Sequence, residues 1–372
     1  MNHLPARPRF PGLDSLRAYA ALFVVVGHIP MNQASLGLPS PAPAALFFRG
    51  APAVSFFFTL SGFLITYLLL DEQQRHGKID VRAFYLRRVL RIWPLYFATI
   101  AFGLFFYNAL LPWLGIPYRV EYNLGLAILL YLFFLPNLMN SLYTVGGLLN
   151  PSWSIGIEEQ FYLAWAPALK RWHHRLPRLA VTVLVVSFAA FLVNRLNPFH
   201  MAEMVKFFDQ LKFHFMAAGA LAAWALRERR EALLALPVFR HGWLQWALGL
   251  FLAQYFLVDL WPMPWWLEEL VQLFLFTWLL IEVGVNPRRR MPLENRFAEW
   301  LGTISYGVYM LHMIAIYFTS WLFKNGGWWV GTPWLYHLGY YGLAVALTIL
   351  LSYLSFRYFE GPLLALKSRL AR

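Results

Sequence analysis

Long apolar runs dominate this chain of 372 residues and restrict its fold more than any other feature. A helix needs roughly 20 apolar residues to cross a bilayer, and about ten such runs follow one another along the chain. Hydrophobic residues make up 60% of the sequence and charged residues only 13%. Because a soluble domain does not need so much apolar surface, the sequence predicts an all-α, polytopic membrane helix bundle that occupies residues 1–372 as one domain.

The predicted spans are separated by short loops that carry most of the charge. They cover residues 12–30, 46–70, 86–110, 155–169, 179–196, 211–226, 243–260, 266–284, 299–323 and 336–358. One more apolar run, 124–139, is short and ends around Pro136 and Asn137. Whether this run crosses the membrane decides the orientation of every later span.

The distribution of basic residues indicates that 124–139 does not cross. If the N-terminus is cytoplasmic and this run is re-entrant or interfacial, all but six of the 31 Lys and Arg residues lie on the cytoplasmic side, as the positive-inside rule requires. The six that remain outside are Arg49, Arg119, Arg195, Lys206, Lys212 and Lys324. We therefore expect ten spans with both termini in the cytoplasm.

The formal charge of +13 does not indicate a nucleic-acid partner, because the basic residues are scattered between apolar spans and form no continuous face. Cytoplasmic retention of loops and attraction to the anionic lipid bilayer explain them better. Cysteine is absent, which excludes disulfides, thiolate metal sites and a cysteine nucleophile. No metal site and no permanently bound cofactor are expected.

Three ionisable residues lie in the first span. Asp14 and Arg17 are near its cytoplasmic end, three residues apart and able to pair, and His28 is near its outer end. Eleven residues separate Arg17 from His28, so both share one helix face and lie about 16 Å apart along the axis. Charges at such depth usually face a bundle interior. Asp14 and Arg17 could instead be interfacial anchors, with His28 bonded to a backbone carbonyl.

Several motifs together resemble those of the acyltransferase-3 family of integral membrane O-acyltransferases. They share the family's order and cover nearly the whole chain. The matching segments are Arg17 with His28, Phe56–Thr66 (FFFTLSGFLIT), Phe84–Phe97 with Arg88 and Arg91, Pro151–Leu163 (PSWSIGIEEQFYL), Leu301–His312 (LGTISYGVYMLH), and Glu360 with Pro362.

The resemblance implies transfer of an acyl group, acetyl in the first place, from acyl-CoA at the cytoplasmic side to a hydroxyl of an extracytoplasmic glycan or exopolysaccharide. Acetyl-CoA would then be the donor substrate, and the bacterial cytoplasmic membrane the location. Many members carry an additional soluble domain that is absent from residues 1–372. A second transfer step would therefore need a periplasmic or biosynthetic partner protein.

The resemblance also implies which residues bind the donor. Arg88 and Arg91 share one helix face at the cytoplasmic mouth of the third span, and Arg17 lies at the same depth in the first. Guanidinium groups suit the phosphates of CoA. Retention of a cytoplasmic loop and contact with lipid phosphates are the alternative explanation.

The predicted catalytic residues are His28 and Glu158. His28 would either deprotonate the acceptor hydroxyl or carry the acyl group for a short time. Glu158, or its neighbour Glu159, would polarise His28 or bind sugar hydroxyls. Alternatively, both carboxylates only favour the dipole at the start of a helix that Ser152 or Ser154 caps.

The predicted substrate-binding residues lie in three parts of the chain. They are Asp14, Ser152, Trp153, Ser154, Glu159, Tyr306, Tyr309 and His312. Tyr306, Tyr309 and His312 lie at i, i+3 and i+6 on one helix face, where a polar seam between helices is the alternative. In the second span we interpret Ser61 and Gly62 as a close helix contact.

Two other functions remain open. A transporter or flippase of a glycan or acylated product would often show inverted repeats and broken helices in matching halves, and no convincing repeat is present. The same enzyme could also act on a small-molecule acceptor, which an acceptor assay would distinguish.

Overall fold

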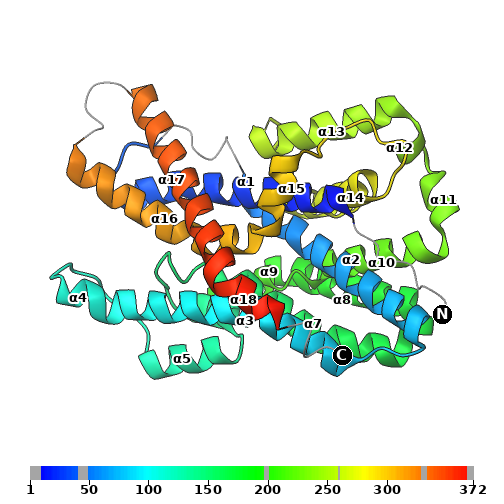
Figure 1. Cartoon of the computed structure of the whole chain (residues 1–372), viewed down its shortest axis with the longest axis horizontal. Coiled ribbons are helices and arrows are strands. Elements are labelled where there is room, and N and C mark those ends of the chain that lie inside the picture. Colours follow the sequence, from blue (N-terminus) through cyan, green and yellow to red (C-terminus); the bar gives the residue numbers. More distant parts are fainter. Residues whose placement is uncertain (1–9, 41–48, 197–200, 259, 328–332, 367–372) are drawn as a thin grey trace.

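The computed structural model describes residues 10–40, 49–196, 201–258, 260–327 and 333–366, and the regular elements in these ranges are helices (Figure 1). The predicted all-helical fold is therefore confirmed. Residues 46–48 and 259 of the predicted spans, and the basic residues of the two chain ends, lie outside the described residues.

Eight helices have 20 residues or more. They are α1 (Pro11–Ser35), α2 (Ala51–His76), α3 (Val81–Phe105), α7 (Ser152–Trp172), α8 (Leu176–Arg195), α14 (Trp265–Gly284), α16 (Ser305–Gly326) and α17 (Pro333–Ser355). The shorter ones are α4 (Leu111–Trp113), α5 (Leu124–Leu132), α6 (Pro136–Leu142), α9 (Ala202–Gln210), α10 (Phe213–Glu228), α11 (Arg230–Leu234), α12 (Pro237–Arg240), α13 (Gly242–Leu257), α15 (Arg296–Thr303) and α18 (Gly361–Ala365).

Six helical stretches of the described chain are long and apolar enough to cross a membrane. They are Gly12–Ser35, Ala51–His76, Val81–Trp113, Ser152–Arg195, Ser305–Gly326 and Pro333–Ala365. α10 and α13 have only 16 residues each, and α14 carries three glutamates within its 20 residues. A multi-pass membrane protein is thus supported, while the number of ten spans and the orientation of the termini stay predictions.

Two predicted segments differ from the observed helices. The ninth span, expected as 299–323, is broken at Ile304. α15 ends one residue before it, at Thr303, and α16 begins one residue after it, at Ser305. The run 124–139 forms α5 and α6, which are separated near Phe134, a residue with a positive φ of 55°. At 1.5 Å per residue the nine residues of α5 reach only about 14 Å, too short to cross a bilayer.

The most extensive helix contact joins α2 to α10. It is close because a glycine of each helix faces the backbone of the other. A Cβ atom at Gly62 would lie 1.9 Å from the carbonyl oxygen of Met216, and one at Gly219 would lie 2.0 Å from that of Thr59. Small residues at such contacts let helix backbones approach each other in membranes, so the interpretation of Gly62 as a packing residue is confirmed.

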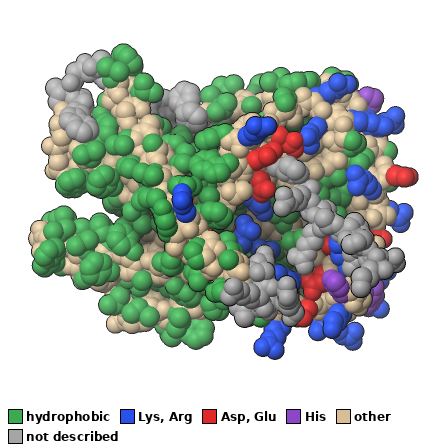
Figure 2. Space-filling view, in the orientation of Figure 1, with side chains coloured by type: hydrophobic (Ala, Val, Ile, Leu, Met, Phe, Trp, Pro, Cys, Tyr) green, Lys and Arg blue, Asp and Glu red, His purple; other side chains and the backbone are tan. Residues whose placement is uncertain are grey.

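Charged side chains are unevenly distributed over the visible surface. Figure 2 shows that Lys, Arg, Asp and Glu gather on one half of the molecule, while the other half is covered mainly by hydrophobic side chains. The C-terminal end of α2 and the start of α3 lie toward the charged half (Figure 1). Near the end of α2, Asp71 pairs with Arg75 at 2.8 Å and with Arg227 of α10 at 3.4 Å.

We expect Gly219→Ala to destabilise the protein, because its Cβ would meet the backbone of Thr59 and Phe63 at 2.0 and 2.7 Å. Overpacking of this kind costs about 1–3 kcal/mol, so the unfolding temperature in detergent should fall. Gly342→Ala is the matched control, because its Cβ on α17 would meet nothing within 4 Å. A control that unfolds as early as Gly219→Ala would contradict this account of the contact.

Candidate functional site

A cavity of about 180 Å³ lies between α2, α3, α7 and α16, in the middle of the bundle. Polar side chains from five helices, α1, α2, α3, α7 and α16, line it together with apolar residues of α2. The polar lining comes from Arg17, Ser61, Arg88, Arg91, Glu158 and Tyr309. Residues predicted from distant motifs of the sequence therefore meet at one place.

Three guanidinium groups border this cavity. Arg17 is paired with Asp14 at 2.5 Å, so the two first-span residues bond to each other as predicted from their spacing. Arg88 lies over the rings of Phe84 and Tyr162, at 5.5 and 5.3 Å from the ring centroids. Among the described residues, neither Arg88 nor Arg91 has an acidic partner within ion-pair distance. A cation inside a membrane bundle is costly unless it is paired, so the cavity favours an anionic ligand.

A second, smaller cavity of about 110 Å³ adjoins the first along the C-terminal half of α2. Leu68, Arg88 and Arg91 border both cavities, so these side chains lie at the junction. The smaller cavity is lined by charged residues of the last turns of α2 and the first turns of α3, including Glu72 and Arg87, which pair at 2.9 Å. The two cavities together extend from the charged end of α2 into the bundle.

The Glu158 carboxylate is held at the cavity wall by two hydroxyl groups. Ser61 donates to one of its oxygens at 2.8 Å and Tyr162 donates to the other at 2.8 Å. Neither oxygen is bonded to His28, so Glu158 does not polarise that imidazole in this structure. Its neighbour Glu159 accepts from the indole nitrogen of Trp93 at 3.2 Å and does not border the cavity.

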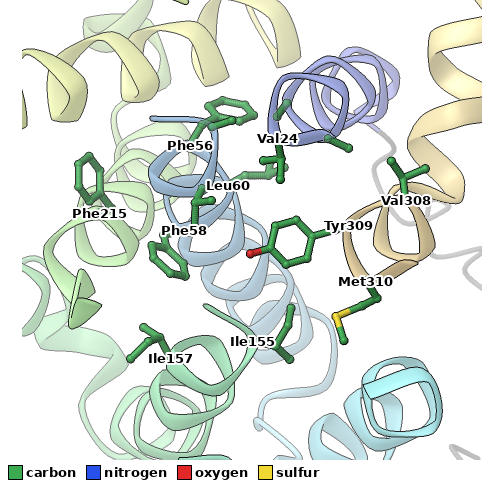
Figure 3. Packing of buried hydrophobic residues seen from close by; sticks show 14 of the residues in the cluster. Val24, Phe56, Phe58, Leu60, Ile155, Ile157, Phe215, Val308, Tyr309 and Met310 are labelled. Carbon is green, nitrogen blue, oxygen red and sulfur yellow. The ribbon is translucent and has the colours of Figure 1, made fainter. Parts of the chain in front are cut away.

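The start of α7 forms the inner end of the cavity. The Ser154 hydroxyl lies 2.6 Å from the hydroxyl of Tyr309, which projects from α16 between α2 and α7 (Figure 3). Ser152 is buried and donates to the carbonyl of Leu149 at 2.6 Å. The predicted helix caps are wrong: Pro151 is the N-cap residue, and the hydroxyls of Ser152 and Ser154 donate to backbone carbonyls and accept from no helix amide.

Behind Tyr309 lie two histidines. The ring centroids of Tyr309 and His312 are 5.9 Å apart, and those of His312 and His28 are 4.9 Å apart. Nδ1 of His28 is 2.8 Å from the carbonyl of Val24, and Nδ1 of His312 is 2.5 Å from that of Tyr309. Since a carbonyl can only accept, both imidazoles carry their proton on Nδ1, and each keeps a basic Nε2.

The structure thus brings together seven of the predicted site residues around the central cavity. They are Arg17, Arg88, Arg91, Ser154, Glu158, Tyr306 and Tyr309. His28, His312, Ser152, Trp153, Glu159 and Asp14 do not border it. The predicted catalytic residue His28 is thus separated from the cavity, which ends at Tyr309, one aromatic side chain short of the histidine pair.

Sequence reasoning missed two residues of the site. Ser61 was interpreted as a packing residue like Gly62, and Tyr162 was not singled out, yet both hydroxyls hold Glu158. Tyr162 could have been found, because it lies one helical turn after Glu158. The role of Ser61 depends on the contact between α2 and α7, which no local pattern reveals.

Comparison with known proteins identifies the family. The sequence profile of the acyltransferase-3 family, described as an acyltransferase domain, matches residues 10–353. The chain belongs to this family. No solved structure gives a significant match.

Similar bacterial proteins have names that refer to O-acetylation. The name of YrhL of Bacillus subtilis assigns it provisionally to peptidoglycan O-acetylation. YrhL is 28% identical over 388 aligned residues, gaps included, and the match covers 98% of this chain and 56% of YrhL. The O-acetyltransferase OatA of Staphylococcus aureus is 33% identical over 187 residues, 48% of this chain and 28% of that protein. The peptidoglycan O-acetyltransferase OatA of Listeria monocytogenes is 30% identical over 172 residues, 43% of this chain and 24% of that protein. The chain therefore spans little more than half the length of YrhL.

Proposed function

We propose that this member of the acyltransferase-3 family transfers an acyl group, acetyl in the first place, from acyl-CoA at the cytoplasmic side to a hydroxyl of an extracytoplasmic glycan. One observation carries the proposal. Two guanidinium groups that have no acidic partner among the described residues, Arg88 and Arg91, lie at the junction of two cavities that lead from the charged end of α2 into the bundle.

The unpaired guanidinium groups suit a donor with phosphates. CoA carries a diphosphate and a 3′-phosphate, and planar guanidinium forks bind phosphate oxygens in pairs. The central cavity beyond Arg91 is lined by apolar side chains such as Phe57, Phe58 and Leu64 and by hydroxyl groups of serines and tyrosines. This mixture suits a pantetheine arm, which carries methylene groups as well as amides. Phosphates held at the junction would place the thioester toward Ser154 and Tyr309.

His28 is the proposed base or acyl carrier. As base, its Nε2 takes the proton of the acceptor hydroxyl, the oxygen attacks the thioester carbonyl, the carbon–sulfur bond breaks, and CoA leaves as a thiolate that then takes up a proton. As carrier, Nε2 attacks the thioester carbonyl, the carbon–sulfur bond breaks and CoA leaves as a thiolate. The acceptor hydroxyl then attacks the acyl-imidazole, the carbon–nitrogen bond breaks, and the hydroxyl proton goes to the thiolate. Either route requires the Tyr309 ring to move, because the cavity ends there.

A glycan acceptor is favoured by the relatives, two of which have peptidoglycan in their names. Membership in an acyltransferase family favours transfer over transport as the activity. The proposed location is the bacterial cytoplasmic membrane, with ten spans and both termini in the cytoplasm, which keeps the donor site on the side where CoA is made.

We expect Arg88→Ala and Arg91→Ala each to raise the KM for acetyl-CoA about tenfold or more, since a hydrogen bond to a charged group contributes about 1.5–3 kcal/mol. Initial rates of purified protein with radiolabelled acetyl-CoA and envelope fractions measure this. Arg82→Ala is the matched control, because Arg82 is exposed on the same helix and borders neither cavity. An unchanged KM in both cavity variants would refute the phosphate site.

His28→Ala should lower acyl transfer about 10²–10⁴-fold, the range that a general base contributes, while the KM for acetyl-CoA stays close to that of the parent. The measurement is incorporation of label into the glycan by protein whose insertion and unfolding temperature are unchanged. His174→Ala, an exchange at an exposed position of the 3₁₀ turn between α7 and α8, should transfer normally. Full activity of a folded His28→Ala protein would remove His28 from the mechanism.

The proposed orientation can be tested directly because the chain has no cysteine. We expect a cysteine at Lys78 to react with a membrane-impermeant maleimide only from the cytoplasmic side, and a cysteine at Lys324 only from the outer side. Both positions are exposed: Lys78 follows the C-terminal end of α2, and Lys324 lies in the last turn of α16. Labelling of both from the same side would contradict the topology.

A further inference from the structure

A third cavity, the largest of the three at about 620 Å³, lies at the opposite end of α2. It is bordered by the first turn of α2, by Trp153 of α7, by the C-terminal end of α8, by α9 and by the start of α14. Sites for small ligands typically measure about 300–1,000 Å³. Neither the arginines of the donor site nor the two histidines border this cavity.

The three cavities follow one another along α2. The third cavity borders residues 51–55, the central cavity residues 54–68 and the small cavity residues 68–76. These 26 residues extend about 38 Å along the helix axis, comparable to a bilayer with its interfaces. Val54 borders both the third and the central cavity, and the neighbours Trp153 and Ser154 face one cavity each. The wall between the two cavities is therefore a single layer of side chains.

Most charged side chains around the third cavity form ion pairs with one another. Arg49 pairs with Glu268 at 2.6 Å, Arg195 with Asp209 at 2.9 Å, and Lys212 with Glu269 at 2.9 Å. Lys206, at the exposed rim, is left without an acidic partner among the described residues. This arrangement contrasts with the unpaired Arg88 and Arg91 of the donor site, and it favours a ligand that is polar but carries little charge.

Hydrogen-bond acceptors without a donor border the same cavity. Gln272 is only 5% exposed, and its Nε2 donates to the Tyr255 hydroxyl at 2.7 Å, which itself donates to Glu268 at 2.7 Å. Because that hydroxyl has a single proton, the amide of Gln272 cannot be reversed, and its Oε1 is left buried without a partner. Gln210 Oε1 and Asp209 Oδ1 are also buried without a hydrogen-bond partner among the described residues. A ligand with several hydroxyl groups would satisfy all three.

Aromatic side chains complete the lining. Trp153, Phe191 and Trp265 border the cavity, and Trp265 packs edge-on against Phe191 with ring centroids 5.6 Å apart. Flat aromatic surfaces beside a few fixed polar groups are typical of sites that bind a ligand with both apolar and polar faces. The rings of a sugar have such faces, with C–H groups on one side and hydroxyls around the edge.

We propose that this cavity binds the acceptor, an uncharged, polyhydroxylated stretch of glycan, and presents its hydroxyl to the acyl group across Val54. The proposal rests on the proposed acyltransferase function and adds the acceptor site to it. The sugar lies against Trp153 and Trp265, and its hydroxyls donate to Gln210 and Gln272. Donor and acceptor thus approach the same wall from opposite ends of α2.

Calorimetric titration of the purified full chain with di-N-acetylchitobiose, an uncharged disaccharide, tests the site without any need for transfer. We expect Trp265→Ala and Gln210→Leu each to weaken binding about tenfold. Trp266→Ala is the matched control, because this neighbouring tryptophan is 46% exposed and does not border the cavity. It should bind the disaccharide as the parent does. Gln210 lies on a different helix from Trp265, so the two variants test the site independently if one of them folds poorly.

Three results would overturn the proposal: no binding of the disaccharide to the parent protein, unchanged binding in both cavity variants, or displacement of the sugar by inorganic pyrophosphate, which would indicate an anion site instead. Titration of the same proteins with CoA separates this failure from that of the proposed function. If the parent protein binds CoA but not the disaccharide, only the acceptor site is refuted. If the protein binds the disaccharide but neither binds CoA nor transfers an acyl group, the proposed donor chemistry is refuted and the sugar site is retained.

Discussion

The cost of an unpaired cation inside a membrane bundle is the constraint on which the rest of this structure depends. Arg88 and Arg91 come from a helix that is apolar enough to cross a bilayer, yet the described residues offer neither of them a carboxylate. Packing them against aliphatic side chains would cost several kcal/mol each. The fold instead leaves them at the junction of two cavities, where water or an anionic ligand can reach them. The proposed donor site is a consequence of this placement of the two guanidinium groups.

The second helix organises the remaining chemistry. Its glycine contact with α10 fixes one face, and its other faces border three successive cavities whose charges differ. Cations that have no acidic partner in the described part of the chain lie at the middle junction, while the cations at the far end form ion pairs within the protein. A charged donor and an uncharged acceptor can therefore be bound on opposite sides of one wall. Ser61 on the same helix holds Glu158 at the side of the central cavity.

The histidine pair places a limit on the proposed mechanism. Both imidazoles hold their Nδ1 proton on a backbone carbonyl, which leaves two basic nitrogens close together and behind the ring of Tyr309. Tyr309 is itself held by Ser154. In the proposed mechanism, acyl transfer at His28 would therefore require a side-chain movement that breaks the contact between α7 and α16.

The amino-acid sequence by itself determined the helical class, the multi-pass membrane character and seven of the residues that line the central cavity, because apolar length, charge placement and motif order can be read along the chain. It paired Asp14 with Arg17 correctly from their spacing of three residues. The break at Ile304, the role of Ser61 and the end of the cavity at Tyr309 were decided only by the tertiary structure. Each of these depends on which helix lies opposite, and a one-dimensional pattern contains no information about the side chains that a neighbouring helix supplies.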